Sequence, residues 1–197
     1  MGDAGIGKSR LTRAVIDTLS AEPLYRLLFQ CSPHHGSSIL RPVLQRLARV
    51  ANLELAEPVE HALDKLERVL TTGTADVPRA ASLIAPLLGL DGEARYGKLN
   101  LSPAQHRARA LEVLVDQLAG IARRRPLLLI LEDVHWTDAT TLELLDLAID
   151  RLSALPVLVL LTARPAFGPP LRRASGGELA HAGPASPAGR AGDRAIR

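Results

Sequence analysis

The most informative stretch of the sequence is its start, MGDAGIGKSR over residues 1–10. From Gly2 to Ser9 it has the spacing G-x-x-x-x-G-K-S. Glycines let the backbone wrap closely around a polyphosphate, so that several N–H groups point inward. In such a loop the lysine, here Lys8, reaches the β- and γ-phosphates, and the hydroxyl of Ser9 ligates Mg²⁺. The spacing predicts a nucleotide-binding loop, and a glycine-rich turn that precedes a lysine by chance is the alternative.

A helix is expected directly after this loop. Leu11, Val15 and Leu19 recur at four-residue intervals over residues 10–19, which is typical of a helix. The N-terminus of that helix adds the positive end of its dipole to the anion site. The predicted nucleotide-binding residues are Gly2, Asp3, Ala4, Gly5, Ile6, Gly7, Lys8, Ser9 and Arg10.

The chain has 197 residues, which is enough for one domain with a sizeable core. It is 47% hydrophobic but only 3% aromatic, so Leu, Val and Ala must fill the core. A single cysteine, Cys31, excludes an internal disulfide framework. The apolar runs 127–131 and 157–161 are too short to span a bilayer, and no apolar stretch follows a basic start. We expect a cytoplasmic protein with no membrane partner.

The net charge is +3 and the pI is about 9.5. Only three lysines occur, at positions 8, 65 and 98, and arginine supplies the remaining positive charge. Residues 123–125 end a predicted helix, where cations offset the dipole. We interpret the basic balance as a solvated, arginine-rich surface rather than a nucleic-acid face, and we expect no direct nucleic-acid partner.

Strands and helices alternate along the rest of the chain. Residues 24–30 read as a strand, and Ser102, Pro103 and Gln105 form a capping box that starts a helix ending at residues 123–125. Helical faces are predicted in 39–50, 59–70 and 80–90, with connecting loops at 71–78 and 91–100. This order predicts an α/β fold with a mainly parallel sheet.

The segment LLLILEDVHWTD, residues 127–138, carries the second set of candidate residues. A buried strand ends in Glu132 and Asp133, and Asp138 caps the helix that follows. The next strand, 157–161, leads into Thr162 and Arg164. In parallel sheets ligands bind at the carboxyl ends of strands, so these side chains and the phosphate loop are expected to meet there.

Glu132 and Asp133 are the predicted acids of the site. One acid can hold Mg²⁺ opposite Ser9 while its neighbour polarises an attacking water, and the sequence leaves open which does which. The alternative is two solvated acids at a strand end. Arg164 is predicted to contact a γ-phosphate, with a surface arginine as its alternative. Trp136 is expected to pack rather than to contact a base.

Residues 166–197 differ in composition from the rest of the chain. They hold only four large apolar residues, show no sustained period, and are rich in Gly, Pro, Ala and Arg. Such a segment buries too little surface to offset its ordering entropy, so it is predicted to be a disordered tail.

Several stretches resemble the AAA-type ATPase domain of bacterial multidomain adenylate/guanylate cyclase-like regulators, which belong to the STAND class of signal-transduction ATPases. The stretches are GDAGIGKSRL, FQCSPHHGSSILRPVLQRLARVA, LDKLERVL, RYGKLNLSPAQHRARALEVLVDQLAGIARRRPLLLILEDVHWTDATTLELLD and VLVLLTARPAF. The resemblance implies a P-loop NTPase fold, three-layer αβα with a parallel sheet. It also implies that Gly2, Gly7, Lys8 and Ser9 form the Walker A loop, that Glu132 and Asp133 are the Walker B acids, and that Arg164 is a sensor. The first acid is Glu where the wider class usually has Asp.

Two departures from that family stand out. Its members carry an apolar strand just before the Walker A loop, whereas only Met1 precedes Gly2 here. By the family's strand order, that strand lies beside residues 157–161. The resemblance also stops near Pro170. We therefore expect a fragment, with a partial P-loop ATPase domain over 1–165 that lacks its first strand, and a tail over 166–197 that a frameshift would explain.

The function expected on these grounds is an ATP-binding switch module. Mg-ATP binding and slow hydrolysis, with Asp133 orienting water, would drive a conformational change in regulatory protein domains. The chain would thus be a weak ATPase with ATP and Mg²⁺ as cofactors. One alternative is the ATPase module of a LuxR-type, DNA-binding transcription regulator, although no helix-turn-helix is visible. A P-loop kinase and a non-functional truncated remnant are the others.

Overall fold

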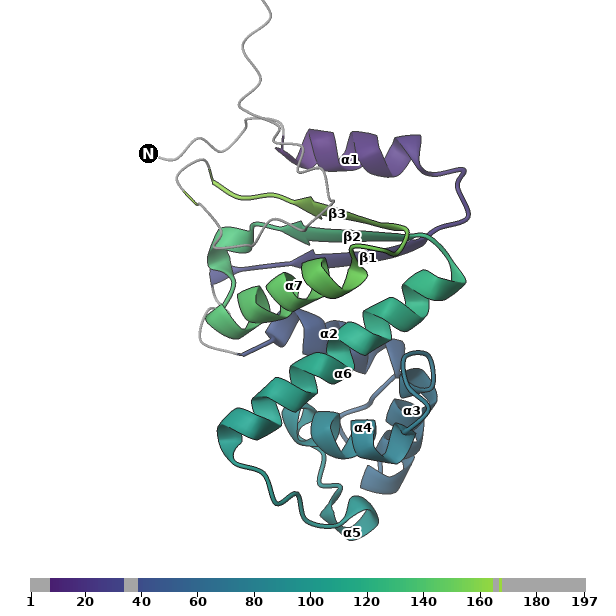
Figure 1. The fold of residues 1–197 in the computed structure, drawn as a ribbon, viewed down its shortest axis with the longest axis vertical. Coiled ribbons are helices and arrows are strands. Elements are labelled where there is room, and N and C mark those ends of the chain that lie inside the picture. Colours follow the sequence, from purple (N-terminus) through teal and green to yellow (C-terminus); the bar gives the residue numbers. More distant parts are fainter. Residues whose placement is uncertain (1–7, 34–38, 165–166, 168–197) are drawn as a thin grey trace, which may run out of the picture. The chain divides into compact units, whose positions relative to one another are not determined.

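The structure is a computed structural model that describes residues 8–33, 39–164 and 167, in two units (Figure 1). One unit, Met1–Glu22 with Glu178–Arg197, contains the described helix α1 (Lys8–Thr18). The other, Pro23–Gly177, contains the sheet and the remaining helices. Its elements are β1 (Tyr25–Gln30), α2 (Arg41–Val50), α3 (Val59–Leu70), α4 (Val77–Ile84), η2 (Ala85–Leu88), α5 (Glu93–Tyr96), α6 (Pro103–Arg124), β2 (Leu127–Glu132), η3 (Val134–Trp136), α7 (Ala139–Leu152) and β3 (Val157–Leu161).

Helix α1 confirms the helix predicted directly after the phosphate loop. It begins at Lys8, two residues earlier than the apolar period alone indicated, and its first turn carries no acidic side chain. The residues before it, 1–7, lie outside the described part of the chain. The positive end of the α1 dipole is therefore not offset by an acid of its own first turn.

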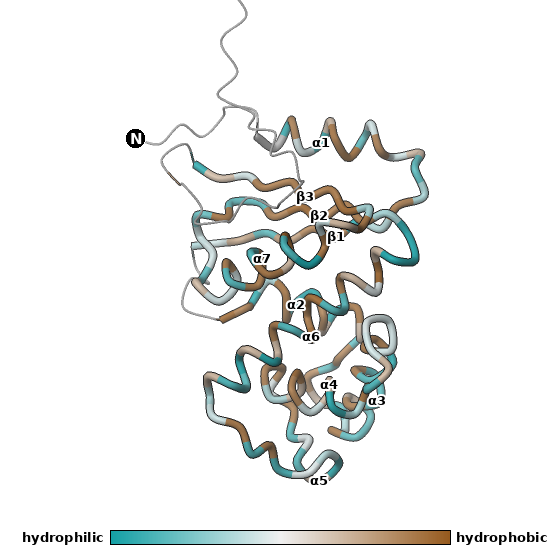
Figure 2. Tube along the Cα trace, in the orientation of Figure 1, coloured by the Kyte–Doolittle hydropathy of each residue, from teal (hydrophilic) through white to brown (hydrophobic). Residues whose placement is uncertain are grey.

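The sheet is parallel throughout, as predicted, in the order β1-β2-β3. In the register of this sheet, Tyr25 of β1 pairs with Leu127 of β2, and Leu127 pairs with Val157 of β3. Strand β2 is buried along residues 127–131, as expected for a strand with neighbours on both sides and helices over it. Figure 2 shows hydrophobic runs along β2 and β3, whereas β1, with the sequence YRLLFQ, also contains hydrophilic residues. Among the described residues no strand lies beyond β3.

Helices α2, α6 and α7 lie on one face of this sheet (Figure 1). Side chains of β1 and β2 alternate, so that Leu27, Phe29, Leu129 and Leu131 all point to that face. A second apolar core forms among α3, α4 and the N-terminal half of α6, with Leu63, Leu66, Leu70, Ile84 and Leu111 at its centre. The α/β fold class predicted from the sequence is confirmed.

The caps of α6 and α7 follow the sequence prediction. Gln105 N donates to Ser102 Oγ at 3.3 Å and Ser102 N donates to Gln105 Oε1 at 2.9 Å, which completes the capping box. Pro103 opens α6, and Pro126 follows its end. Asp138 caps α7 by accepting hydrogen bonds from the backbone of Thr140 and Thr141.

Three local expectations differ from the structure in their bounds or in the type of helix. The helical stretch predicted over 80–90 is α4 followed by the 3₁₀ turn η2, because Pro86 lacks an N–H and its ring obstructs an α-helix. Helix α4 also begins at Val77, capped by Asp76, so it takes the end of the loop predicted over 71–78. The loop predicted over 91–100 contains the single turn α5.

Polar contacts to α3 hold that turn in place. Arg95 lies 2.7 Å from Asp64 and 3.2 Å from Glu67, and the hydroxyl of Tyr96 donates to Glu67 at 2.8 Å. Burial and the Glu67 carboxylate raise the pKa of Tyr96, so this hydroxyl stays a donor. These contacts depend on residues about thirty positions apart, which a local turn signal does not report.

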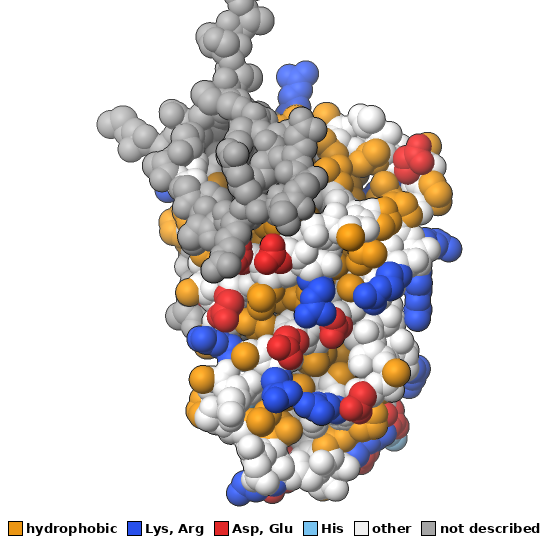
Figure 3. Space-filling view, viewed as in Figure 1, with side chains coloured by type: hydrophobic (Ala, Val, Ile, Leu, Met, Phe, Trp, Pro, Cys, Tyr) orange, Lys and Arg blue, Asp and Glu red, His pale blue; other side chains and the backbone are white. Residues whose placement is uncertain are grey.

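The described surface mixes both signs of charge. On the face that Figure 3 shows, Lys and Arg side chains are interspersed with Asp and Glu side chains over the helices. No helix among residues 8–33, 39–164 and 167 is both long enough and apolar enough to cross a membrane.

Two glycines bring the turn after α3 against α6. A Cβ on Gly120 would lie 2.1 Å from the carbonyl oxygen of Thr72, and a Cβ on Gly73 would lie 2.5 Å from the Cα of Gln117. Gln117 completes the contact by donating from Nε2 to the carbonyl oxygen of Leu70 at 2.7 Å. The nearest atom to each position belongs to the backbone, and a Cβ on Gly73 would also lie 2.6 Å from Nε2 of Gln117, so neither position has room for a methyl group.

We expect Gly120→Ala to destabilise the protein by about 2 kcal/mol in urea unfolding, because overpacking outweighs the usual gain of about 1 kcal/mol for Ala in a helix. Exposed Glu112 on the same helix is the control, since Glu112→Ala should change the free energy of unfolding by less than about 0.5 kcal/mol. A stabilised Gly120→Ala variant would contradict the close approach.

Candidate functional site

The carboxyl ends of the three strands meet at one edge of the sheet. Gln30 pairs with Glu132 in register, and Cys31 N donates to the carbonyl oxygen of Glu132 at 3.0 Å. On the other side of β2, Thr162 N donates to the carbonyl oxygen of Leu131 at 2.9 Å. The polar residues predicted at these strand ends are thus brought together, as the parallel arrangement requires.

Asp133 ends β2 in an unusual backbone conformation. Its φ of 56° and ψ of 44° lie in the left-handed region, which an L-residue other than glycine adopts at a cost of about 1 kcal/mol. This turn directs the chain out of the sheet plane and into η3. Such strain is often retained at functional sites, where the surrounding structure over-determines it.

Thr162 holds that conformation from the neighbouring strand end. Its Oγ1 accepts a hydrogen bond from Asp133 N at 3.0 Å, and its carbonyl oxygen accepts one from Val134 N at 2.9 Å. Two consecutive N–H groups of the acidic turn are therefore satisfied by one residue. Thr162 positions Asp133 and leaves the carboxylate itself unused.

The two predicted acids have carboxylates that are available for a ligand. Glu132 and Asp133 are half-buried, and within the described residues neither carboxylate forms a hydrogen bond or an ion pair. Oxygen donors of this kind, at the end of a rigid strand, suit a hard divalent cation such as Mg²⁺. Among residues 8–33, 39–164 and 167, no three or more His, Cys, Asp or Glu side chains form a group that could hold a metal ion. On the sheet, the predicted Mg²⁺ site therefore consists of these two acids.

Asp138 links this region to α2. While Oδ1 caps α7, Oδ2 accepts hydrogen bonds from the hydroxyl of Thr141 at 2.5 Å and from Leu40 N at 3.2 Å. Leu40 precedes α2 in a left-handed conformation and is fully buried. One carboxylate thus fixes the start of two helices, a second role that its capping position in the sequence did not reveal.

Arg164 and Trp136 form a stacked pair beside the acids. The guanidinium carbon lies 4.9 Å from the centroid of the indole ring, a cation–π contact, and the Arg164 side chain is exposed. His135 lies 5.0 Å from Trp136 and 6.4 Å from Phe167, centroid to centroid. Trp136 therefore packs against the side chains of His135 and Arg164, and the expectation that it does not contact a base stays a prediction.

Cys31 is buried at the end of β1, close to the acidic turn. Burial raises the pKa of its thiol, and the negative charges of Asp133 and Asp138 add to this effect, while a hydrogen bond with Thr137 opposes it. The thiol is therefore kept neutral. No local signal in the sequence places Cys31 beside the acids.

The loop half of the predicted site is described only in part. Gly2, Asp3, Ala4, Gly5, Ile6 and Gly7 lie outside the described residues. Lys8 and Ser9 open α1, and Arg10 is exposed. Because α1 and the acids belong to separate units, the site that joins Lys8 and Ser9 to Glu132 and Asp133 stays a prediction.

The left-handed conformation can be tested without any ligand. We expect Asp133→Gly to be more stable than Asp133→Ala by about 1 kcal/mol in urea unfolding, since both lack the carboxylate but only glycine adopts this φ freely. The same pair of substitutions at Glu112, within α6, should give the opposite order by about 1 kcal/mol. Equal stability of the two Asp133 variants would contradict the assigned backbone geometry.

Comparison with known proteins agrees with this geometry. Residues 1–160 match the family described as AAA ATPase domain. The chain is also 33% identical over 166 residues to an uncharacterized protein of Rhizobium meliloti (strain 1021), and the match covers 84% of this chain and 16% of the relative. The chain thus spans only a small part of that relative's length. No solved structure matches the chain significantly.

The family match includes both the G-x-x-x-x-G-K-S loop and the acids at the end of β2. The chain belongs to the AAA ATPase domain family of P-loop nucleoside triphosphatases, a membership that indicates nucleotide binding and ATPase activity.

Proposed function

We propose that this chain is an ATP-driven switch module in a signalling protein, with Mg-ATP bound between the loop of residues 2–9 and the acids of β2. The observation that carries the proposal is the pair of unengaged carboxylates, Glu132 and Asp133, held at the carboxyl edge of a parallel sheet. Carboxylates left unpaired at this edge are suited to a cation and a water rather than to fold stability.

Each group has a distinct part in the proposed mechanism. The N-terminus of α1 and Lys8 hold the phosphates, while the hydroxyl of Ser9 and one of the two acids hold Mg²⁺. When bound, Mg²⁺ neutralises charge on the β- and γ-phosphates. Asp133 orients the attacking water, since its position is fixed by Thr162 through the backbone and its carboxylate remains free. Arg164, stacked on Trp136, reports the presence of the γ-phosphate.

The proposed contact with the γ-phosphate is close in sequence to the residue that supports Asp133. Arg164, which contacts the γ-phosphate in this proposal, follows two residues after Thr162, which positions Asp133. Loss of the γ-phosphate would therefore alter the support of both. Regulatory protein domains are the proposed recipients of this change, a view supported by the much greater length of the relative from Rhizobium meliloti.

The first test is calorimetric titration of the purified chain with Mg-ATP. We expect saturable binding that Lys8→Ala weakens by about 10- to 100-fold, because a charge-assisted contact to phosphate is lost. Arg13, exposed on the same helix but outside the loop motif, supplies the matched control, and Arg13→Ala should bind like the parent chain. A folded chain that binds no nucleotide would overturn the proposal, and titration with Mg-GTP would test the preference for ATP.

The roles of the two acids can be separated by phosphate release. Asp133→Asn should retain Mg-ATP binding and lower turnover by about 100-fold, because the group that orients water is neutralised. Glu132→Gln should weaken binding in the presence of Mg²⁺ but not in EDTA. Asp150→Asn, on the exposed side of α7, is the control that should leave both unchanged. If Asp133→Asn turns over normally, the assignment of the water-orienting acid is wrong.

A further inference from the structure

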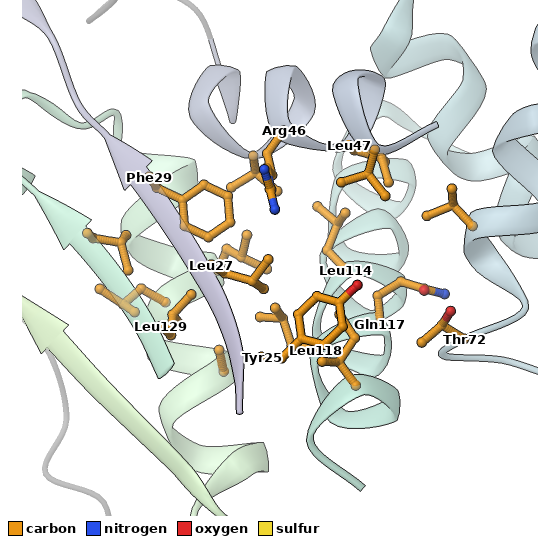
Figure 4. A pocket seen from close by; sticks show the side chains of 18 of the residues that line it. Tyr25, Leu27, Phe29, Arg46, Leu47, Thr72, Leu114, Gln117, Leu118 and Leu129 are labelled. Atoms are coloured by element: carbon orange, nitrogen blue, oxygen red, sulfur yellow. The ribbon is translucent and has the colours of Figure 1, made fainter. Parts of the chain in front are cut away.

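An apolar cavity lies between one face of the sheet and the helices over it. Its volume is about 270 Å³, and it is partly open to solvent and lined by residues of β1, β2, α2, α6 and α7 (Figure 4). The wall is mostly apolar and leucine is its commonest residue, with Leu27, Phe29, Leu47, Leu114, Leu118 and Leu129 among the lining residues. A dry cavity of about 150 Å³ accommodates benzene, so this one has room for a longer apolar group.

The cavity contains one polar group that nothing in the described protein satisfies. Arg46 extends from α2 toward the sheet beside the Phe29 ring (Figure 4). Its Nε is buried and has no hydrogen-bond partner, and among residues 8–33, 39–164 and 167 the guanidinium forms no ion pair. A buried donor left without an acceptor is costly, so an acceptor from a ligand would be stabilising.

Charge at this cavity has a single sign. Arg46, Arg124 and Arg125 line it, whereas none of the described lining residues is Asp or Glu. Gln117 does not compete for a ligand, because its Nε2 already donates to the carbonyl oxygen of Leu70. The remaining arrangement is an apolar, leucine-rich cavity with the guanidinium of Arg46 in its wall, which is complementary to an apolar molecule that carries one anionic group.

We propose that this cavity binds an apolar monocarboxylate, with its carboxylate on Arg46 and its hydrocarbon part among the leucines of β1, β2 and α6. Guanidinium presents a planar fork of donors that matches a carboxylate. The volume suits a medium-length acyl chain better than a phospholipid. The site is separate from the proposed nucleotide site and uses none of its residues, so it does not depend on nucleotide binding.

The test is calorimetric titration of the full chain with decanoate below its micelle concentration, in parallel with decanol. We expect one saturable site for decanoate and at least about tenfold weaker binding of decanol, because the alcohol lacks the anionic group that pairs with Arg46. Equal binding of the two compounds, non-saturating adsorption, or no binding by a folded chain would each overturn the proposal.

Two substitutions on one helix locate the site. Arg46→Met keeps the length of an unbranched side chain, removes the charge, and should weaken decanoate binding by about tenfold or more while leaving decanol unaffected. Arg49→Met is the matched control, since Arg49 is exposed on α2 and does not line the cavity. If both variants bind decanoate alike, Arg46 is not the anion contact. Should Arg46→Met fail to fold by circular dichroism, the comparison of decanoate with decanol on the parent chain decides the question.

Discussion

The structure is organised around the parallel pairing of β2 with both of its neighbours. Its five apolar residues, 127–131, are buried on both faces, so every backbone N–H and C=O among them must find a partner in the sheet. β1 and β3 supply those partners in an unbroken register. Pairing in parallel requires crossover connections, and the helices that make these connections also cover one face.

The same constraint places the chemistry. A strand that is apolar along its length and buried on both faces reaches polar surroundings only at its end, and there the chain places Glu132 and Asp133. Because the neighbouring strand ends at the same level, Thr162 can accept from Asp133 N and hold the left-handed turn. The strain at Asp133 is thus compensated by contacts that only a parallel neighbour provides. The contacts that stabilise this turn also position Asp133, while the Asp133 carboxylate stays free.

The apolar cavity lies in a core with few aromatic side chains. Only 3% of the chain is aromatic, and mainly aliphatic side chains line the space between the sheet and the helices. Elsewhere the helices approach closely, as at Gly73 and Gly120, where backbone meets backbone. Between α2 and the sheet the packing is looser, and Arg46 extends into the space that remains. Helix α6 therefore makes a close backbone contact at Gly120 and also lines the cavity.

Several features were predictable from the sequence because the forces that determine them are local. Apolar periodicity predicted α1, α2, α3 and α6, and unbroken apolar runs predicted β2 and β3. Capping by Ser102 and Asp138 was predicted from residues within three positions of each cap. The positions of the two acids and of Arg164 near one sheet edge followed from the rule that parallel strands end at the same side. Local rules failed where they conflicted, as at Pro86, which ends an otherwise helical pattern.

The loop motif and the two acids are evident in the sequence because each consists of adjacent residues, and the fold class follows from the alternation of apolar runs and helical periods. Packing between distant segments sets the left-handed turn at Asp133, the hydrogen bond from Leu40 to Asp138 across 98 positions, the stacking of Arg164 on Trp136, and the cavity that receives Arg46. The physical reason is that these features arise between segments far apart in the chain. Their geometry depends on how strands and helices pack, and no local propensity encodes that packing.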